Sequence, residues 1–219
     1  MVKRKIIFGN YDTAAHDWTL AAWKLSAAVE KTNYVDKPGG DGSWDLSTAL
    51  TDGIARYKDR TLTVTLESSE GDRMSREATI REMINTLDGT RQNIELPDDT
   101  LHYISGRIHV SRDYNNIVNA RVSVTATCEP WKYSNLETSL TLTASSTKKT
   151  ATLINNGRRA VVPVLTVTGS ILVEFGGLSQ TLQTGTYKLP AILLLPGRHS
   201  LTYSGSGTLV VTYREAVLE

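Results

Sequence analysis

The sequence predicts a mainly β protein with two domains: an N-terminal β-sandwich-like domain that contains one α-helix, and a C-terminal antiparallel β-sandwich. Three observations lead to this prediction. Threonine is unusually common, with 28 residues, and most threonines alternate with Val, Ile or Leu as they do in half-buried strands. Only one segment has a convincing helical period. The composition of the chain also changes near residue 135.

Alternating apolar and hydroxyl-bearing side chains identify the strands. In residues 61–66, the leucines and the valine share one face and the threonines share the other. Residues 122–127 and 208–213 repeat this pattern. Because successive side chains of a strand point to opposite faces, each segment predicts one face in the core and one face toward solvent or a partner.

The helix is predicted over residues 74–87. Its apolar residues recur at the spacing i, i+3, i+4 and i+7: Ile80, Met83, Ile84 and Leu87. Asp72 or Ser75 can cap its start, and Gly89 follows its end. We therefore expect one amphipathic helix packed on a sheet.

A second, shorter helix over residues 18–29 is an alternative. Ser26 and the polar continuation into Thr32 and Asn33 weaken it. The prediction therefore contains one helix.

Two domains follow from the change in composition. Residues 1–135 hold 17 basic and 19 acidic side chains and all four tryptophans, whereas residues 136–219 hold 7 basic and 4 acidic side chains and no Asp or Trp. The polar run 144–150 is interpreted as a loop or as a strand edge blunted by lysine. Turn signals then punctuate the second part, at residues 155–157, 176–177, 196–197 and 204–207. This spacing is typical of an antiparallel sandwich of about 80 residues.

Charge and hydropathy exclude several classes of protein. The net charge is +1 and no Lys/Arg-rich run of five or more residues occurs, which argues against a nucleic-acid-binding or membrane-surface protein driven by charge. No apolar stretch reaches the roughly 18 residues of a membrane span, and the N-terminus does not match a signal peptide. The one cysteine, Cys128, allows no intrachain disulfide. We expect a protein made in a reducing cytoplasm.

Catalytic and cofactor motifs are missing from the sequence. The glycine-rich segment 38–45 lacks both the Lys-Ser/Thr ending of a phosphate loop and the acidic spacing of a calcium loop. His102 and His109 are seven residues apart in a strand-like run, which places them on opposite faces. The Gly-Ser-Gly of residues 205–207 is interpreted as a hairpin turn and not a nucleophile elbow. Asp98 and the aspartate after it follow a proline in a predicted turn. The prediction is a protein that is not an enzyme, with no metal and no cofactor.

Carbohydrate binding is the alternative function. Sugar sites use exposed aromatic faces, and four aromatic side chains occur in the second part: Phe175, Tyr187, Tyr203 and Tyr213. Three of them fall in strand-like runs, so core packing explains them better. A cell-wall hydrolase is a further alternative, but the sequence has no paired carboxylates on a plausible scaffold.

Specific strings add a resemblance to a known family. They lie at residues 34–50, 56–62, 103–108, 128–133, 185–190, 195–197 and 211–215. In this order and spacing they resemble the distal tail proteins (Dit) of long-tailed phages and their prophages. The first four strings resemble the N-terminal domain of that family, and the last three resemble its C-terminal galectin-like β-sandwich.

The resemblance implies a structural role in the virion. It implies a homo-hexameric ring, formed by residues 1–135, that joins the tail tube protein to the hub and receptor-binding proteins and leaves a channel for DNA. It places residues 136–219 outside the ring as a galectin-like domain with no room for an inserted sugar-binding module, so that a partner recognises the receptor. The implied location is the tail tip, after assembly in the cytoplasm of the bacterial host. The alternative in this setting is a carbohydrate-binding adhesin module of the tail tip.

Four residues are candidates for the contacts between ring subunits: Trp44, Leu46, Tyr57 and Arg60. A glycine-rich loop that carries Trp44 predicts burial of the indole, either against a neighbouring subunit or in the core of its own domain. Threonine rows and unpaired strand edges can also pair across subunits of a closed ring.

Overall fold

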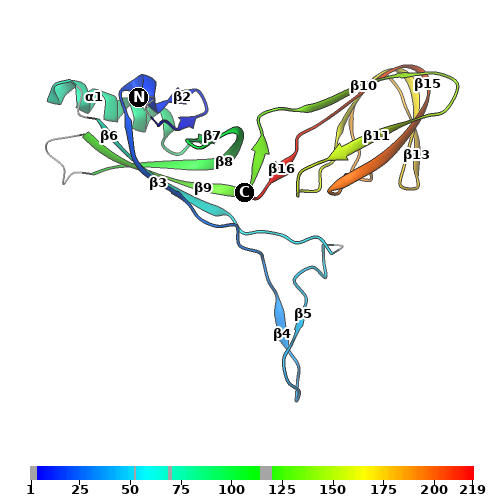
Figure 1. Cartoon of the computed structure of the whole chain (residues 1–219), viewed down its shortest axis with the longest axis horizontal. Coiled ribbons are helices and arrows are strands. Elements are labelled where there is room, and N and C mark those ends of the chain that lie inside the picture. Colours follow the sequence, from blue (N-terminus) through cyan, green and yellow to red (C-terminus); the bar gives the residue numbers. More distant parts are fainter. Residues whose placement is uncertain (1–3, 52, 69–70, 114–119) are drawn as a thin grey trace. The chain divides into compact units, whose positions relative to one another are not determined.

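The structure is a computed structural model that describes residues 4–51, 53–68, 71–113 and 120–219. The chain divides into two compact units, unit 1 from Met1 to Pro130 and unit 2 from Trp131 to Glu219. Each unit has its own apolar core. The predicted fold class is confirmed, because the described residues form antiparallel sheets and a single α-helix (Figure 1).

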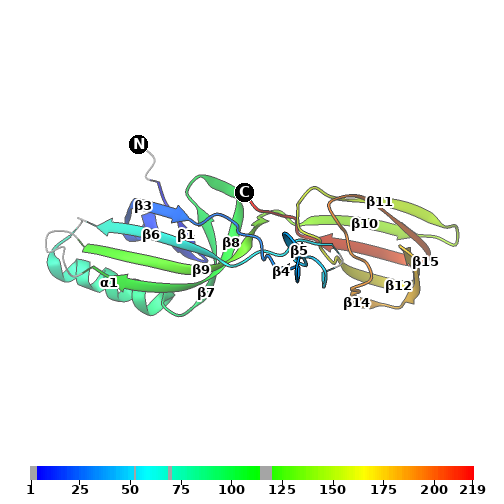
Figure 2. The same cartoon turned by 90° about the horizontal axis from the view of Figure 1, so that it is seen from below.

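Unit 1 is built from one large sheet, one helix and a small hairpin. Its elements are β1 (Ile7–Phe8), β2 (Tyr11–Asp12), the 3-10 helix η1 (Thr13–His16), β3 (Thr19–Leu25), β4 (Tyr34–Asp36), β5 (Ser43–Asp45), β6 (Arg60–Ser68), α1 (Arg73–Leu87), β7 (Arg91–Leu96), β8 (Asp99–Arg112) and β9 (Ala120–Ser134). The large sheet has the order β2-β1-β7-β8-β9-β6-β3. Figure 2 shows β8, β9 and β6 running side by side. In this sheet β3 and β2 are the edge strands within the described residues.

The inner face of this sheet is formed by the apolar residues that alternate with threonine or serine in β6 and β9. Leu62, Val64 and Leu66 of β6 are fully buried, and Val122 and Val124 of β9 are buried beside them. Val64 pairs directly with Val124, so the two apolar rows lie on the same face. The predicted division of each strand into a core face and an exposed threonine face is therefore confirmed here.

Helix α1 covers the apolar core of unit 1. Ile80, Met83 and Leu87 are buried, and Ile84 packs against the same core. Asp72 is the N-cap, and its carboxylate accepts hydrogen bonds from the Ser75 backbone N–H at 2.8 Å and from the Ser75 hydroxyl at 2.7 Å. The predicted helix and its Asp72 cap are confirmed.

Two aspartates that flank α1, Asp72 and Asp88, have lowered pKa values. The hydrogen bonds from the Ser75 backbone N–H and hydroxyl lower the pKa of Asp72 below its usual range. At the other end, the Val110 N–H donates to Asp88 at 2.8 Å, and this bond together with His109 lowers the pKa of Asp88. A carboxyl whose pKa is lower in the folded state stabilises the protein above its unfolded pKa, and this stability is lost as the pH falls through the folded pKa.

We therefore expect the melting temperature to fall as the pH drops from about 5 to below about 3, from just above the usual aspartate pKa down through the lowered pKa of the folded state. In Asp72→Asn/Asp88→Asn the fall should be smaller, because asparagine can still accept the capping bonds but does not titrate. Circular dichroism melts over a pH series measure this. The control is Asp41→Asn, which changes an exposed aspartate away from the helix. An equal pH dependence in the double variant and the control would contradict the role of the caps.

The alternative helix over residues 18–29 is wrong. Residues 19–25 form β3, which pairs antiparallel with β6 and carries a register shift between Leu20 and Ala22. Trp23 and Leu25 pack against the core from this strand, while Trp18 is fully buried just before it. Pairing with β6 outweighs the weak local helix preference of the segment.

Unit 2 is a single curled sheet that closes on its own core. Its elements are β10 (Thr138–Ala144), β11 (Lys149–Asn155), β12 (Val164–Phe175), β13 (Leu178–Leu182), β14 (Gly185–Lys188), β15 (Gly197–Tyr213) and β16 (Ala216–Val217). Along one side, β15 pairs first with β11 and then with β10, and along its other side it pairs with β12. The short β16 pairs with Lys132 and Tyr133, the part of β9 that belongs to unit 2.

Three glycines bend β12 and β15 where these long strands cross from one half of the sandwich to the other. Gly169, Gly205 and Gly207 have φ values of 97°, 131° and 116°. A Cβ on Gly207 would lie 1.7 Å from the Thr168 carbonyl oxygen, so no side chain fits there. The residues before and after the bend belong to one core. The interpretation of residues 204–207 as a hairpin turn is wrong, because they lie inside β15.

Candidate interaction surface on a projecting arm

A long projection leaves unit 1 between β3 and β6 (Figure 1). We call residues 27–59 the arm. None of the described arm residues is buried in the chain. Ten large apolar side chains of the described residues are exposed, and six of them lie in the arm: Val29, Tyr34, Val35, Trp44, Leu46 and Leu50. The arm thus carries more than half of the exposed large apolar side chains of the described residues, and none of its described residues is buried.

The outer part of the arm is the β4–β5 hairpin. Its turn is closed by the Lys37 N–H, which donates to the Gly42 carbonyl at 3.2 Å. Gly39 and Gly42 adopt φ values of 69° and 76° in this turn, which glycine tolerates without strain. The glycine-rich segment 38–45 therefore forms the tip of a hairpin and its second strand, which contains Trp44.

One face of the hairpin is apolar. Val35 lies directly opposite Trp44, so their side chains share a face. Leu46 follows Trp44 by two positions, and its N–H donates to the Asn33 carbonyl at 2.8 Å, which continues the ladder. Leu46 therefore lies on the same face. We call Val35, Trp44 and Leu46 the apolar face of the arm.

The opposite face of the hairpin is polar except for Tyr34. The Ser43 hydroxyl donates to Asp36 at 2.8 Å, and the Ser47 N–H donates to Asp45 at 2.9 Å. Hydrogen bonds from Ser47 lower the pKa of Asp45 below its usual range. The hairpin is thus two-sided, although an isolated pair of strands is marginally stable in water. Such a ribbon is stabilised when its apolar side is covered.

The base of the arm is fixed to the sheet of unit 1. The Ser26 N–H donates to the Thr61 carbonyl at 2.9 Å, and the Thr61 N–H donates back to the Ser26 hydroxyl at 2.8 Å. Arg60, at the start of β6, donates from Nε to the Ser26 carbonyl at 2.6 Å. Glu30 and Tyr57 form a bridge further out. The arm therefore has a defined point of attachment.

The structure places the four predicted interface residues along this arm in two different environments. Trp44 and Leu46 are 51% and 42% exposed, so the indole is not buried in the core of its own domain. Tyr57 is half-buried near the base. Arg60 is 2% exposed. Trp44 and Leu46 are thus brought together on one surface, whereas Arg60 is buried at the start of β6, where the arm is attached.

Arg60→Ala is expected to lower the free energy of unfolding by about 2 kcal/mol, because the Ser26 carbonyl loses a charged donor in a buried position. Urea unfolding followed by circular dichroism measures this. The matched control is Arg56→Ala, because Arg56 is exposed in the arm and should change stability by less than about 0.5 kcal/mol. Equal stabilities of the two variants would contradict a positioning role for Arg60.

The sequence does not single out Val29, Tyr34, Val35 and Leu50. These residues have neither a helical period nor a strand alternation long enough to mark a face. In this segment, which is rich in glycine and charge, isolated apolar residues that no predicted core strand can cover are the signal that could identify them. That signal becomes readable once the register of β4 and β5 is known.

Clusters of side chains that could hold a metal ion are not found in the part of the chain that the structure describes. No group of three or more His, Cys, Asp or Glu side chains comes together there. His102 contacts Asp99 at 2.9 Å and His109 contacts Asp88 at 2.8 Å, so the two histidines serve separate local contacts. Cys128 is buried, and burial raises the pKa of its thiol to about 11.

Two of the aromatic side chains considered for sugar binding, Tyr203 and Tyr213, are buried in the core of unit 2. Phe175 and Tyr187 pack against the same core. Their predicted role in core packing is confirmed. Within the described part of the chain, each helix is too short or too polar to span a membrane.

The fold of the chain is similar to that of a solved phage protein. The crystal structure of SPP1 Dit (gp 19.1), described as a paradigm of the hub adsorption apparatus in phages that infect Gram-positive bacteria, matches with a TM-score of 0.70. The match covers 96% of this chain and 98% of that chain, at 15% sequence identity. No protein-family model matches the sequence, and no curated protein matches it either. The resemblance to distal tail proteins is thus confirmed at the level of the fold.

Proposed function

We propose that this chain is a structural protein of a phage tail tip, in which copies of unit 1 form a hexameric ring between the tail tube and the host-adsorption apparatus. The likeness to SPP1 Dit over nearly the whole of both chains supports the tail-tip role. The observation that carries the ring is the arm, which exposes an apolar face that the chain itself leaves uncovered. In a closed ring each subunit offers such a surface to its neighbour.

The four candidate residues have different roles in this proposal, because their exposure differs. Trp44 and Leu46 contact the neighbouring subunit directly, because a half-exposed tryptophan on an apolar strand face is a typical hot spot of an interface. Tyr57 extends the contact near the base. Arg60 is buried and positions the arm through the Ser26 carbonyl. The edge strands β3 and β2 supply unpaired backbone groups that can extend the contact between subunits.

The ring leaves a channel through which DNA passes. A lumen that transmits DNA should not hold phosphates, and the near-neutral charge of the chain, with 24 basic and 23 acidic side chains, supports this. Carboxylates of the N-terminal part line the channel. The ring binds no specific DNA sequence.

Unit 2 is the galectin-like domain that points outward and contacts the hub and receptor-binding proteins. Of the four aromatic residues within 136–219, two lie in the core and the others pack against it, which supports receptor recognition by a partner and not by this chain. A glycan array probed with the purified chain is expected to show no specific binding. Tight and selective binding to one glycan would favour the adhesin alternative.

Immunogold labelling of phage particles that carry this protein tests the proposed location. Antibodies against the chain are expected to label one end of the tail, at the junction with the adsorption apparatus. The control is the same antibody preincubated with free protein. Label along the whole tail, on the capsid or on no part of the particle would contradict the tail-tip role.

A further inference from the structure

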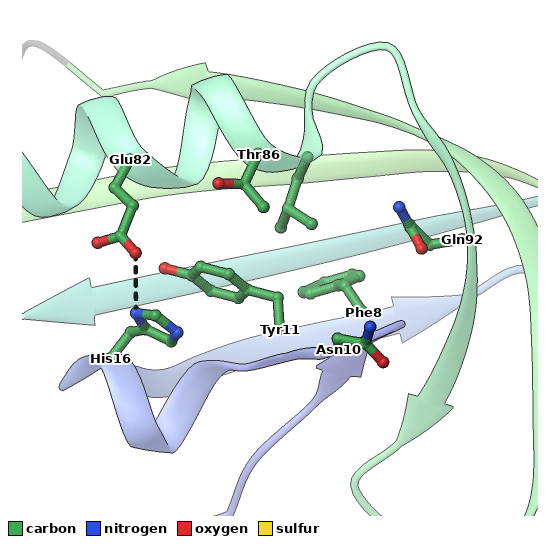
Figure 3. Close-up of a pocket in the computed structure, with 8 residues that line it drawn as sticks. Phe8, Asn10, Tyr11, His16, Glu82, Thr86 and Gln92 are labelled. Carbon is green, nitrogen blue, oxygen red and sulfur yellow. Dashed lines mark ion pairs between the residues drawn. The ribbon is translucent and has the colours of Figure 1, made fainter.

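Unit 1 contains an open pocket of about 340 Å³, away from the arm. It lies between η1 and α1, and Figure 3 shows side chains from both elements facing it. The aromatic floor is formed by Phe8 and Tyr11, which are 1% and 5% exposed. The rim is polar and includes Glu82 of α1 and His16 of η1.

The floor of the pocket is neutral and planar. Burial raises the pKa of Tyr11 to about 12, so its hydroxyl keeps its proton at neutral pH. This hydroxyl accepts a hydrogen bond from Trp18 Nε1 at 3.1 Å, which fixes the ring. The imidazole of His16 stacks on Tyr11, with ring centroids 4.1 Å apart and planes 8° apart. Because Phe8 and Tyr11 are almost fully buried, the aromatic surface that a ligand can reach is the imidazole of His16, which is held in place on Tyr11 and whose side chain is 33% exposed.

The rim carries one carboxylate with unused acceptor capacity. The side chain of Glu82 is 53% exposed, and His16 Nδ1 lies 3.4 Å from its Oε1. This distance is longer than the roughly 2.7–2.9 Å of a charge-assisted hydrogen bond, so the carboxylate can still accept stronger donors. No Lys or Arg belongs to the lining that the described residues form.

We propose that this pocket binds the guanidinium group of an arginine from a partner protein. A guanidinium is planar, stacks on aromatic rings and offers five N–H donors in a fork that matches a carboxylate. Glu82 supplies the matching charge, and the amide oxygens of Asn10 and Gln92 and the hydroxyl of Thr86 can accept the remaining donors. The volume is at the lower end of the range for ligand sites, which fits one side chain and not a larger ligand.

The size of the pocket also predicts selectivity between cations. A lysine ammonium is a compact charge without a plane, so it cannot stack on the His16 imidazole and pair with Glu82 in the same fixed geometry. We expect arginine to bind more tightly than lysine. The interaction would add a contact of unit 1 that is independent of the arm and of the ring.

NMR titration of the isotope-labelled full chain with N-acetyl-arginine methylamide tests the proposal. Saturable shifts are expected at residues that line the pocket, with a dissociation constant in the millimolar range, about −4 kcal/mol. The citrulline analogue has nearly the same shape without the charge and should bind at least about tenfold more weakly. The lysine analogue should fall between them.

Glu82→Gln should abolish the shifts, and Glu137→Gln, the same change at an exposed site in unit 2, should leave them intact. Thr86→Val provides a second test and should weaken binding a few-fold. Spectra of each variant without ligand establish that the fold is retained. The proposal is overturned by equal binding of the arginine and citrulline probes, by binding that survives Glu82→Gln, by shifts located outside the pocket or by no saturable shifts.

Discussion

Replacing Trp44 and Leu46 together with serine is expected to abolish the ring and leave a folded monomer of 24.1 kDa. The two side chains, 51% and 42% exposed in the single chain, form the apolar face of the arm together with Val35. Truncating a tryptophan hot spot at an interface costs about 2 kcal/mol or more, which is roughly a thirtyfold loss in affinity. A closed ring repeats the contact at every subunit, so the loss applies to each of them.

Size-exclusion chromatography with light scattering and thermal melting together test this prediction. At a concentration low enough for the unaltered chain to be monomeric, the variant and the unaltered chain should have similar melting temperatures, because neither side chain is buried in its own chain. The matched control is Leu101→Ser/Leu136→Ser, which removes two apolar side chains that are 68% and 78% exposed outside the arm. If this control and the arm variant have the same effect on assembly, the arm does not form the contact.

Gly207→Ala should strongly destabilise unit 2. The new Cβ would lie 1.7 Å from the Thr168 carbonyl oxygen, which belongs to the backbone of the paired strand and cannot move away alone. The φ of 116° also strains any residue with a side chain. Together the clash and the strain should cost at least about 3 kcal/mol, which is more than about 10 °C in melting temperature for a unit of this size.

Gly176→Ala is the control for this effect. Gly176 also has a positive φ, of 52°, but a Cβ there would meet nothing within 4 Å. We expect it to cost about 1 kcal/mol from backbone strain alone. Scanning calorimetry compares the two variants. Equal transitions would mean that the bend in β12 and β15 tolerates a side chain and that our account of how the sandwich closes is wrong.

The elements that local chemistry determines were predictable from the sequence. Helix α1 has an N-cap at Asp72 and apolar residues at helical spacing, and the structure has the same cap and buries the same face. The strands that alternate Thr with Leu or Val, such as β6, bury the predicted rows. In these segments local propensity and tertiary packing favour the same structure.

Features that depend on long-range pairing were not predictable. Residues 204–207 have the composition of a turn, yet Gly205 and Gly207 lie within β15 because the paired strand β12 bends at Gly169 at the same point. The strand β3 forms because β6 pairs with it, although its own residues specify it weakly. A single sequence does not show which strands will be partners.

The candidate site was predictable in part. The position of Trp44 in a glycine-rich segment predicts an interface residue, and in the structure Trp44 is exposed on a hairpin. Its neighbour on that face, Val35, becomes identifiable only from the register of β4 and β5. Arg60 has the composition of a surface residue, and its burial depends on a backbone carbonyl 34 positions away. The pocket near Glu82 likewise joins segments distant in sequence.

Native mass spectrometry of the purified chain over a concentration series tests the central claim most directly. The account predicts a species of six chains, six times 24.1 kDa or about 145 kDa, that becomes dominant as the concentration rises. A chain that remains at 24.1 kDa at every concentration, or that assembles with a different and closed number of subunits, would contradict the proposed hexameric ring.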